Sequence, residues 1–307
     1  MKRKIFMLSI LVFALTACAA KKGTVPPGPY ELAKYPGAEQ TMQIEGIRIV
    51  FIDEGKGAPI LFIHGLSGDI SDWNDNIAYF KQHYRVVALD LPGHGKSEKR
   101  DDIRYGRELF TRVVSEFLKG RGVDRAVVIG NSMGGLIAAS LTLAHPEQVG
   151  KLVLSDAAGV SGIAFYLKWA AALATPGMTR KFWASPKTIA KTAGNAFAHP
   201  ENYPVARVRN DIAMVQAPDA KNYSYAVLRS LQDTLKQNLR GDLAKIKCPT
   251  LIIWGDHDTV INPKAATIWK DGIPGSKLVF IPETGHIPMV ERPEAFNNTV
   301  ETFINGH

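Results

Sequence analysis

The sequence has little cysteine, no internal repeat and no low-complexity segment. Only two cysteines, Cys18 and Cys248, occur in its 307 residues. Of these residues 46% are hydrophobic and 21% are charged, which suits one globular unit with room for a lid, or at most two domains. Cys248 comes just before an apolar run, so we interpret it as a small core residue rather than a nucleophile.

The chain also lacks an N-terminal apolar run long enough to cross a bilayer comfortably. Residues 5–15 are apolar and follow a basic start at residues 1–4, but a spanning helix needs about 20 residues. Leu15-Thr16-Ala17-Cys18 resembles the lipobox of bacterial lipoproteins. The resemblance implies a signal peptide over residues 1–17, a diacylglyceryl thioether on the Cys18 sulfur and a fatty acyl group on its new amino terminus. A plain secretory signal and a short membrane anchor are the alternatives.

Lipidation implies a location in the bacterial cell envelope. Stable anchoring needs two or more acyl chains, which a triacylated Cys18 would supply. Ala19 follows the cysteine in place of the Asp that resembles an inner-membrane retention signal. In a Gram-negative cell this favours the periplasmic face of the outer membrane. With Cys18 lipidated, no internal disulfide can form.

A strong charge of one sign is missing as well. The formal net charge is +8, from 37 basic and 29 acidic residues. Removing residues 1–17 takes away three basic residues and no acidic one, which leaves +5. This modest excess gives no case for nucleic acid as a partner.

Apolar strands alternate with helical segments along most of the chain. Continuous runs of Val, Ile and Leu separated by helices predict an α/β fold with a mostly parallel sheet covered on both faces. We expect an early strand pair within residues 44–52 and further strands at residues 59–63, 84–90, 126–129, 152–154, 251–254 and 277–281.

The alternation stops between residues 159 and 240. This stretch is helix-like, contains no convincing strand and carries the aromatic residues Phe165, Tyr166, Trp169, Phe182, Trp183 and Phe197. We interpret residues 159–240 as a helical cap inserted into a core of residues 41–158 and 241–307. Residues 18–40, with several prolines and little periodicity, are predicted to be an extended tether.

The strongest chemical signal is Gly130-Asn131-Ser132-Met133-Gly134, which fits the G-x-S-x-G pattern. It lies directly between a predicted strand and a helix of small residues. A nucleophile elbow is such a strand-to-helix turn, with flanking glycines that let the backbone pack closely. We therefore predict that Ser132 is a nucleophile.

Serine needs a base at neutral pH, and His286 is our candidate. It follows the last predicted strand, so it lies at the sheet edge where catalytic groups of open α/β sheets collect. His257, beside the candidate acids, is its competitor. His83, His145 and His199 fall in solvated or linker contexts, His94 lies in a turn, and His307 is terminal.

Asp258 is the candidate third member, which would orient the imidazole and stabilise its charged form. It follows the strand at residues 251–254, and the resulting order is Ser132, Asp258, His286. Asp256 on the same loop and Asp156 after the strand at residues 152–154 are alternatives.

Two backbone N–H groups are expected to stabilise the oxyanion. Leu66 follows the strand that ends in His64-Gly65, and Met133 follows the nucleophile at a helix N-terminus. His64 is interpreted as a turn-stabilising residue rather than a second base.

Together these motifs resemble the α/β-hydrolase fold-1 family over about residues 41–307. The resemblance rests on His64-Gly65, the segment Asp90-Leu91-Pro92-Gly93-His94-Gly95, the elbow around Ser132, Gly255-Asp256-His257-Asp258 and Gly285-His286. It implies an eight-stranded, mostly parallel sheet with flanking helices. Within the family, the elbow and the segment from Gly285 to Pro293 resemble monoacylglycerol-lipase-like and carboxylesterase members.

The resemblance implies a serine hydrolase of small acyl esters that needs no metal or organic cofactor. A C–C bond hydrolase of ring-fission products is an alternative, but such enzymes carry Trp directly after the catalytic His where this chain has Ile287. A Ser nucleophile disfavours a haloalkane dehalogenase or epoxide hydrolase. The remaining alternative is a catalytically silent binding lipoprotein.

Overall fold

The structure of this protein is a computed structural model. It describes residues 26, 28–160, 173–175, 177, 186, 188, 189 and 193–306. Residues 1–25, which include Cys18, lie outside the described residues, as do the cap aromatics Phe165, Tyr166, Trp169, Phe182 and Trp183. Within the described part of the chain, every helix is too short or too polar to cross a membrane.

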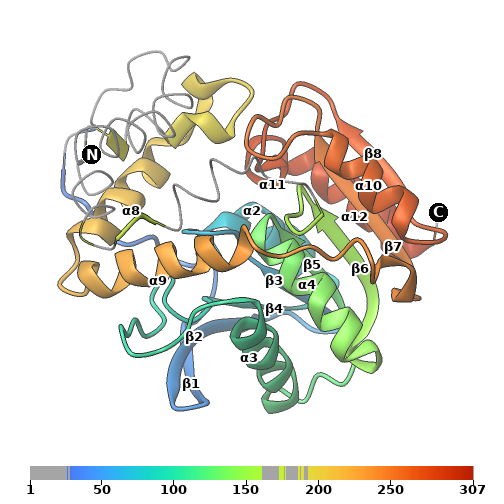
Figure 1. Cartoon of the computed structure of the whole chain (residues 1–307), viewed down its shortest axis with the longest axis horizontal. Helices are drawn as coiled ribbons and strands as arrows, with labels where there is room; N and C mark the ends of the chain where they lie inside the picture. The colour runs from blue at the N-terminus through green and yellow to red at the C-terminus, as the bar shows by residue number, and fades with distance from the viewer. Residues whose placement is uncertain are drawn as a thin grey trace.

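Eight strands form one sheet in the order β1-β2-β4-β3-β5-β6-β7-β8 (Figure 1). β2 is antiparallel to β1 and β4, and all other pairs are parallel. The predicted eight-stranded, mostly parallel sheet is thus confirmed. The strands are β1 (Gln40–Ile44), β2 (Ile47–Glu54), β3 (Pro59–Ile63), β4 (Arg85–Leu89), β5 (Ala126–Asn131), β6 (Val149–Ser155), β7 (Thr250–Gly255) and β8 (Lys277–Ile281).

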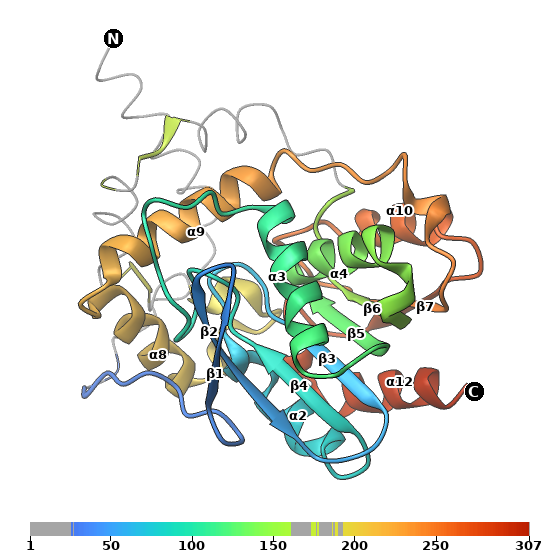
Figure 2. The ribbon, with the colours of Figure 1, turned by 90° about the horizontal axis from the view of Figure 1, so that it is seen from below.

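Helices cover both faces of the sheet (Figure 2). One face is covered by α3 (Arg107–Gly120), α4 (Met133–Ala144) and α10 (Lys264–Gly272), and the other by α2 (Asn74–Phe80), α11 (Pro288–Glu291) and α12 (Pro293–Asn305). Short 3-10 helices occur at η1 (Ile70–Trp73), η2 (Pro146–Gln148), η3 (Ala193–Ala196), η4 (Pro200–Asn202) and η5 (Leu243–Lys245).

Alternate residues of the central strands enter two separate cores. In β3, Leu61 and Ile63 pack in the core beneath α3 and α4, whereas Ile60 and Phe62 pack in the core beneath α2 and α12. Both cores are buried, so each position of this strand must be apolar. The unbroken apolar runs in the sequence follow from this two-sided burial.

The carboxyl ends of the parallel strands lie side by side. The register pairs Ile63 with Gly130, Asn131 with Ser155, and Gly255 with Ile281. The loops that follow β3, β5, β6, β7 and β8 therefore leave the sheet at one edge. This is the edge at which the sequence predicts that the candidate catalytic residues collect.

The segment between β6 and β7 contains the residues of the predicted cap. Its described helices are α8 (Val205–Gln216) and α9 (Ala220–Thr234), and they lie together on one side of the body in Figure 1. The two ends of the insertion meet, because the Leu239 N–H donates to the Gly159 carbonyl at 2.7 Å and Arg240 Nε donates to the Val160 carbonyl at 2.6 Å. These hydrogen bonds join residues at the two predicted ends of the cap, 159 and 240.

The segment before β1 packs against the body. The ring of Tyr35 is 8% exposed and its hydroxyl donates to Asp90 at 2.7 Å. The Ala33 N–H donates to Asn210 of α8 at 2.8 Å, and Tyr30 packs on a cluster in the same helix. The prediction of an extended tether over residues 18–40 is therefore wrong for residues 30–40, because their aromatic rings and backbone are held by the fold.

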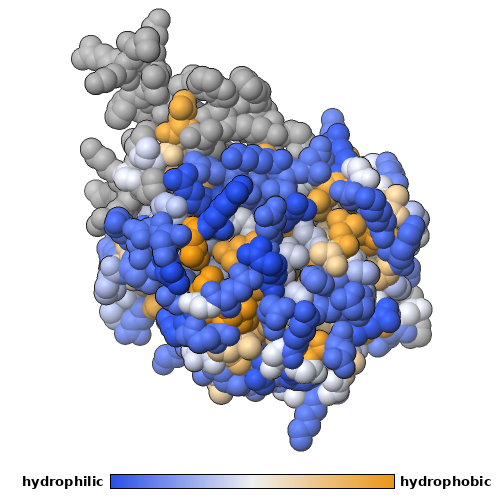
Figure 3. Space-filling view, turned by 60° about the horizontal axis from the view of Figure 1, so that its bottom comes forward, coloured by the Kyte–Doolittle hydropathy of each residue, from blue (hydrophilic) through white to orange (hydrophobic). Residues whose placement is uncertain are grey.

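The face in Figure 3 is mostly hydrophilic, with hydrophobic residues in separate patches between hydrophilic ones. Among the described residues, four large hydrophobic side chains are exposed: Leu173, Val205, Val260 and Phe280. Leu173 and Val205 belong to the predicted cap. The cap thus offers apolar side chains to the solvent as well as to the core.

Candidate active site

Ser132 occupies a sharp turn between β5 and α4. Its backbone has φ 54° and ψ −116°, a conformation that costs a non-glycine residue roughly 1–3 kcal/mol unless its surroundings hold it. The Ser132 N–H donates to the Ser155 carbonyl at 2.9 Å, and the Ser132 carbonyl accepts from Gly135 and Ala158 at 3.0 Å. The turn has the strained strand-to-helix form that the sequence predicts for a nucleophile elbow.

Glycines on both sides of Ser132 make this turn possible. A Cβ at Gly130 would overlap the Gly134 carbonyl, and a Cβ at Gly134 would overlap the carbonyls of Ile63 and His64. β3, β5 and α4 therefore approach one another at distances that only glycine allows.

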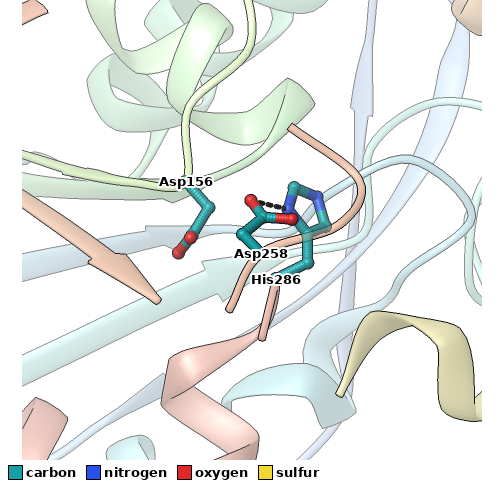
Figure 4. Close-up of side chains that lie close together, drawn as sticks. All are labelled: Asp156, Asp258 and His286. Carbon is teal, nitrogen blue, oxygen red and sulfur yellow. Dashed lines mark hydrogen bonds and ion pairs between the residues drawn. The ribbon is translucent and has the colours of Figure 1, made fainter. Parts of the chain in front are cut away.

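His286 and Asp258 lie on the loops after β8 and β7 and face each other (Figure 4). Nδ1 of His286 is 2.8 Å from Oδ2 of Asp258. The other oxygen, Oδ1, accepts the N–H groups of Val260 at 2.7 Å and Ile261 at 3.0 Å. Because the carboxylate accepts at Nδ1, the neutral ring carries its proton there, and Nε2 has the lone pair that a base needs.

Asp256 and His257 pair with each other instead. Nδ1 of His257 is 2.7 Å from Oδ1 of Asp256, and the two side chains are 52% and 36% exposed. The Asp256 carboxylate raises the pKa of His257, first by this hydrogen bond and then by its charge. The geometry therefore favours Asp258 over Asp256, and His286 over His257, as the members of the site.

Asp156, the second alternative acid, is fully buried beside this pair and has a φ of 45°. Its carboxyl group accepts the Gly255 N–H at 2.9 Å and the Ser155 hydroxyl at 3.0 Å. Burial, and then the negative charge of Asp258, raise the pKa of Asp156 well above its usual range. Burial thus favours the neutral form of Asp156, and Asp258 is the acid whose carboxyl group contacts His286.

Asp156, Asp258 and His286 also lie close enough to be considered as metal ligands. One potential ligand atom from each lies within 4.8 Å of the others. Metal binding requires deprotonated ligands, but burial disfavours ionisation of Asp156, and both oxygens of Asp258 already accept hydrogen bonds. The donor set therefore fits a histidine–carboxylate pair better than a metal site.

The loops that carry the predicted oxyanion donors border Ser132. Met133 is the first residue of α4, so its N–H has no partner within the helix and lies at the positive end of the helix dipole. Leu66 follows Gly65, and a Cβ at Gly65 would lie 3.3 Å from Cβ of Ser132. A carbonyl oxygen at Ser132 would thus have a candidate donor on each of two loops.

His64 stabilises the loop after β3. Its Nε2 accepts the Leu91 N–H at 3.0 Å, and its Nδ1 is 2.7 Å from the Gly65 carbonyl. Burial lowers the pKa of His64, so the ring is neutral. These contacts agree with the interpretation of His64 as a turn-stabilising residue.

Sequence reasoning missed the groups that hold the backbone of His286. Nδ2 of Asn131 donates to the His286 carbonyl at 3.0 Å, and the His286 N–H donates to the Ala196 carbonyl at 2.6 Å. Asn131 is a variable position of the G-x-S-x-G motif, so its place before Ser132 was visible in the sequence. Its contact with a loop 155 residues away was not.

Buried charged groups join the cap to the loop after β3. Arg207 of α8 forms an ion pair with Asp72 at 2.5 Å, and its Nε donates to the Tyr203 hydroxyl at 2.8 Å. Asn210 of the same helix donates to Asp69 at 2.7 Å. Because this loop also carries Leu66, α8 braces the loop of one predicted oxyanion donor.

The fold and the site define a class: α/β proteins with a strained serine, a histidine and a carboxylate on neighbouring strand ends. The chain belongs to the alpha/beta hydrolase fold family, whose model matches residues 58–293.

Its relatives include both lipases and hydrolases of 2-hydroxy-6-oxo acids. Lipase 1 of Psychrobacter immobilis is 28% identical, with 84% of this chain and 80% of the lipase covered. A 2-hydroxy-6-oxononadienedioate/2-hydroxy-6-oxononatrienedioate hydrolase of Escherichia coli is 30% identical over 84% of this chain and 91% of that one. The crystal structure of a bacterial membrane phospholipase A matches with a TM-score of 0.75 and 27% identity, over 98% of this chain and 92% of the other.

Proposed function

We propose that this protein is a serine hydrolase that cleaves carboxylic esters through an acyl-enzyme on Ser132. The observation that carries the proposal is the strained Ser132 at the sheet edge where His286 pairs with Asp258 at 2.8 Å. A serine held in this way has its hydroxyl at the top of the sheet, where a base can reach it.

In this mechanism the Ser132 hydroxyl attacks the ester carbonyl while Nε2 of His286 takes its proton. The N–H groups of Leu66 and Met133 stabilise the oxyanion, and each such donor lowers the barrier by roughly 3 kcal/mol. His286 then protonates the leaving alcohol, which leaves an acyl group on Ser132. A water molecule, activated by the same imidazole, releases the acid and restores the enzyme.

The substrates that we propose are acylglycerols or similar small acyl esters. The relatives named a lipase and a membrane phospholipase A support an acyl-lipid substrate. Exposed apolar side chains on the cap, Leu173 and Val205, suit contact with such molecules. Capped hydrolases accept many substrates, so the choice of acyl and alcohol groups rests on these observations and not on the fold.

We also propose that lipidation of Cys18 anchors the protein in the cell envelope, with the outer membrane favoured in a Gram-negative cell. Metabolic labelling with a palmitate analogue tests this. Wild type should be labelled and sediment with membranes, whereas Cys18→Ser should be neither labelled nor processed at residue 18. Equal membrane association of both proteins without label would contradict lipidation.

C–C bond hydrolysis is the second candidate, because a relative 30% identical is named a hydrolase of 2-hydroxy-6-oxononadienedioate, a compound of the ring-fission type. Turnover of short p-nitrophenyl esters and of a ring-fission product by wild type and Ser132→Ala separates the two. We expect ester turnover by wild type alone. If no ester is cleaved but the ring-fission product is, the ester proposal fails and the C–C reaction replaces it.

A further inference from the structure

Glu291, the last residue of α11, contacts both the histidine loop and the cap. Its Oε2 accepts the Gly285 N–H at 2.7 Å. The same carboxylate accepts the Ala198 N–H, at 3.1 Å from Oε1 and 3.3 Å from Oε2, and Oε1 accepts the His199 N–H at 3.3 Å. Three backbone donors from two distant segments therefore converge on one side chain.

These donors come from the loop that carries His286 and from the predicted cap. Gly285 directly precedes His286, and the Ala198–His199 segment lies between η3 and η4 of the cap. The two segments also touch, since the His286 N–H donates to the Ala196 carbonyl at 2.6 Å. A Cβ at Gly285 would overlap that same carbonyl, so the loop and the cap pack at backbone distance.

The Glu291 carboxylate accepts hydrogen bonds from these backbone groups. Glu45, by contrast, forms an ion pair with Arg112. Within the described residues, the partners of the Glu291 carboxylate are the three N–H groups, and the side chain is half-buried. Hydrogen bonds to an ionised acceptor are shorter and roughly twice as strong as neutral ones. The carboxylate thus links the loop and the cap by three hydrogen bonds to backbone N–H groups.

We propose that Glu291 is a positioning residue that fixes His286 relative to Ser132 by clamping the histidine loop to the cap. The cap then takes part in catalysis by holding the base, in addition to covering the substrate. The proposal rests on the proposed function, because it requires that His286 activates Ser132.

The test measures how fast a fluorophosphonate probe labels Ser132 in full-length protein. This reaction needs the activated serine but does not depend on which ester is the substrate. The variants are Glu291→Ala, which removes all three acceptor contacts, and Glu291→Gln, which keeps the size but offers one acceptor oxygen. Glu54→Ala is the matched control, because half-buried Glu54 accepts a single backbone N–H, from Ala38 at 2.8 Å, at the opposite edge of the sheet.

We expect labelling to slow by about 10- to 100-fold in Glu291→Ala, since displacement of a catalytic group by about 1 Å can cost that much. Glu291→Gln should lie between Glu291→Ala and wild type, and Glu54→Ala should label like wild type. Thermal unfolding of each variant identifies the fraction that is folded, to which every rate is normalised. Glu291→Gln keeps the test open if Glu291→Ala does not fold.

Hydrogen exchange provides a readout apart from chemistry. In both Glu291 variants the amides of Gly285, Ala198 and His199 should exchange faster than in wild type, whereas they should not change in Glu54→Ala. Labelling of folded Glu291 variants at the wild-type rate would overturn the positioning role. A wild type that does not label at all would overturn the proposed function, and this inference with it.

Discussion

The side chain of Asn131 donates from Nδ2 to the main-chain oxygen of His286 at 3.0 Å. The residue before the nucleophile thus holds the base, although 155 positions separate the two in the chain. The same amide nitrogen is 3.3 Å from the Ser155 carbonyl, which also accepts the N–H of Ser132. One buried amide therefore ties the elbow, the end of β6 and the histidine loop together.

This contact gives a first prediction. Asn131→Ala should lower kcat/KM for an ester by about 10- to 100-fold, because it frees the loop of His286 next to the reacting atoms. Asn76→Ala is the control, since it removes another buried amide contact, to Asn297 at 2.7 Å, away from Ser132. Steady-state kinetics on folded protein measures both. A loss of activity that is equal in the two variants would assign Asn131 to general stability alone.

The two buried acids should differ sharply in their effect on activity. Asp258→Asn should reduce kcat by roughly 10³- to 10⁴-fold, because an amide cannot support the correct tautomer or the charged form of His286. Asp156→Asn should change kcat by less than about 10-fold, because burial already favours the neutral form of Asp156 and Asn tolerates its positive φ. A severe loss in Asp156→Asn with little loss in Asp258→Asn would reverse the assignment of the acid.

The ion pair between Arg207 and Asp72 joins α8 to the rest of the protein. We expect its main effect on stability to be that neither buried group is left without a partner. Arg207→Met should lower the free energy of unfolding by roughly 3–5 kcal/mol, since it leaves Asp72 buried without its partner. The double variant Arg207→Met with Asp72→Leu should recover most of this loss. Urea unfolding of wild type, Arg207→Met, Asp72→Leu and the double variant measures the coupling. An Arg207→Met variant as stable as wild type would contradict it.

Asp90 should make stability depend on pH. Burial, and then the charge of Asp69, raise the pKa of Asp90 to about 7, well above its value in an unfolded chain. Between about pH 4 and pH 7 the folded protein therefore keeps a proton that the unfolded chain has released. The contribution of Asp90 to the free energy of unfolding should fall as pH rises through this window and stay constant above it.

Thermal unfolding of wild type and Asp90→Asn across pH 4 to 7 measures this contribution. Replacing Asp90 removes the titrating group, so the downward slope with rising pH should be smaller in the variant. The contacts that Asp90 accepts, from Tyr35 at 2.7 Å and Ile70 at 2.9 Å, weaken in the variant at every pH and so shift the whole curve. Parallel curves for the two proteins would show that Asp90 does not titrate in this range.

The central strands could be predicted because they are buried on both faces. The expected bounds 59–63 agree with β3, which lies inside the sheet and is buried. The bounds 277–281 agree with β8, a partly exposed strand at the sheet edge, whose apolar run ends before Pro282. The first hairpin was placed too late, at residues 44–52, because its turn depends on Glu45 and Gly46 with positive φ rather than on hydrophobic pattern.

The candidate site could be predicted where a residue follows a strand, and not where it is held by a distant segment. Ser132, Asp258 and His286 each follow a strand end, so local pattern and sheet topology were enough to bring them together. The contacts of Asn131 and Glu291 arise between loops far apart in sequence. The packing of Tyr35 against Asp90 likewise depends on tertiary structure, so residues 30–40 resembled a tether in the sequence alone.

The most direct test of the account is rapid mixing of the full chain with p-nitrophenyl butyrate, followed by mass analysis of the quenched protein. The account predicts a burst of p-nitrophenol and a butyryl group on the peptide that contains Ser132. Ser132→Ala should show neither, and His286→Ala should lose the burst. Ester turnover by Ser132→Ala at the wild-type rate, or an acyl group on any other residue during turnover, would contradict it.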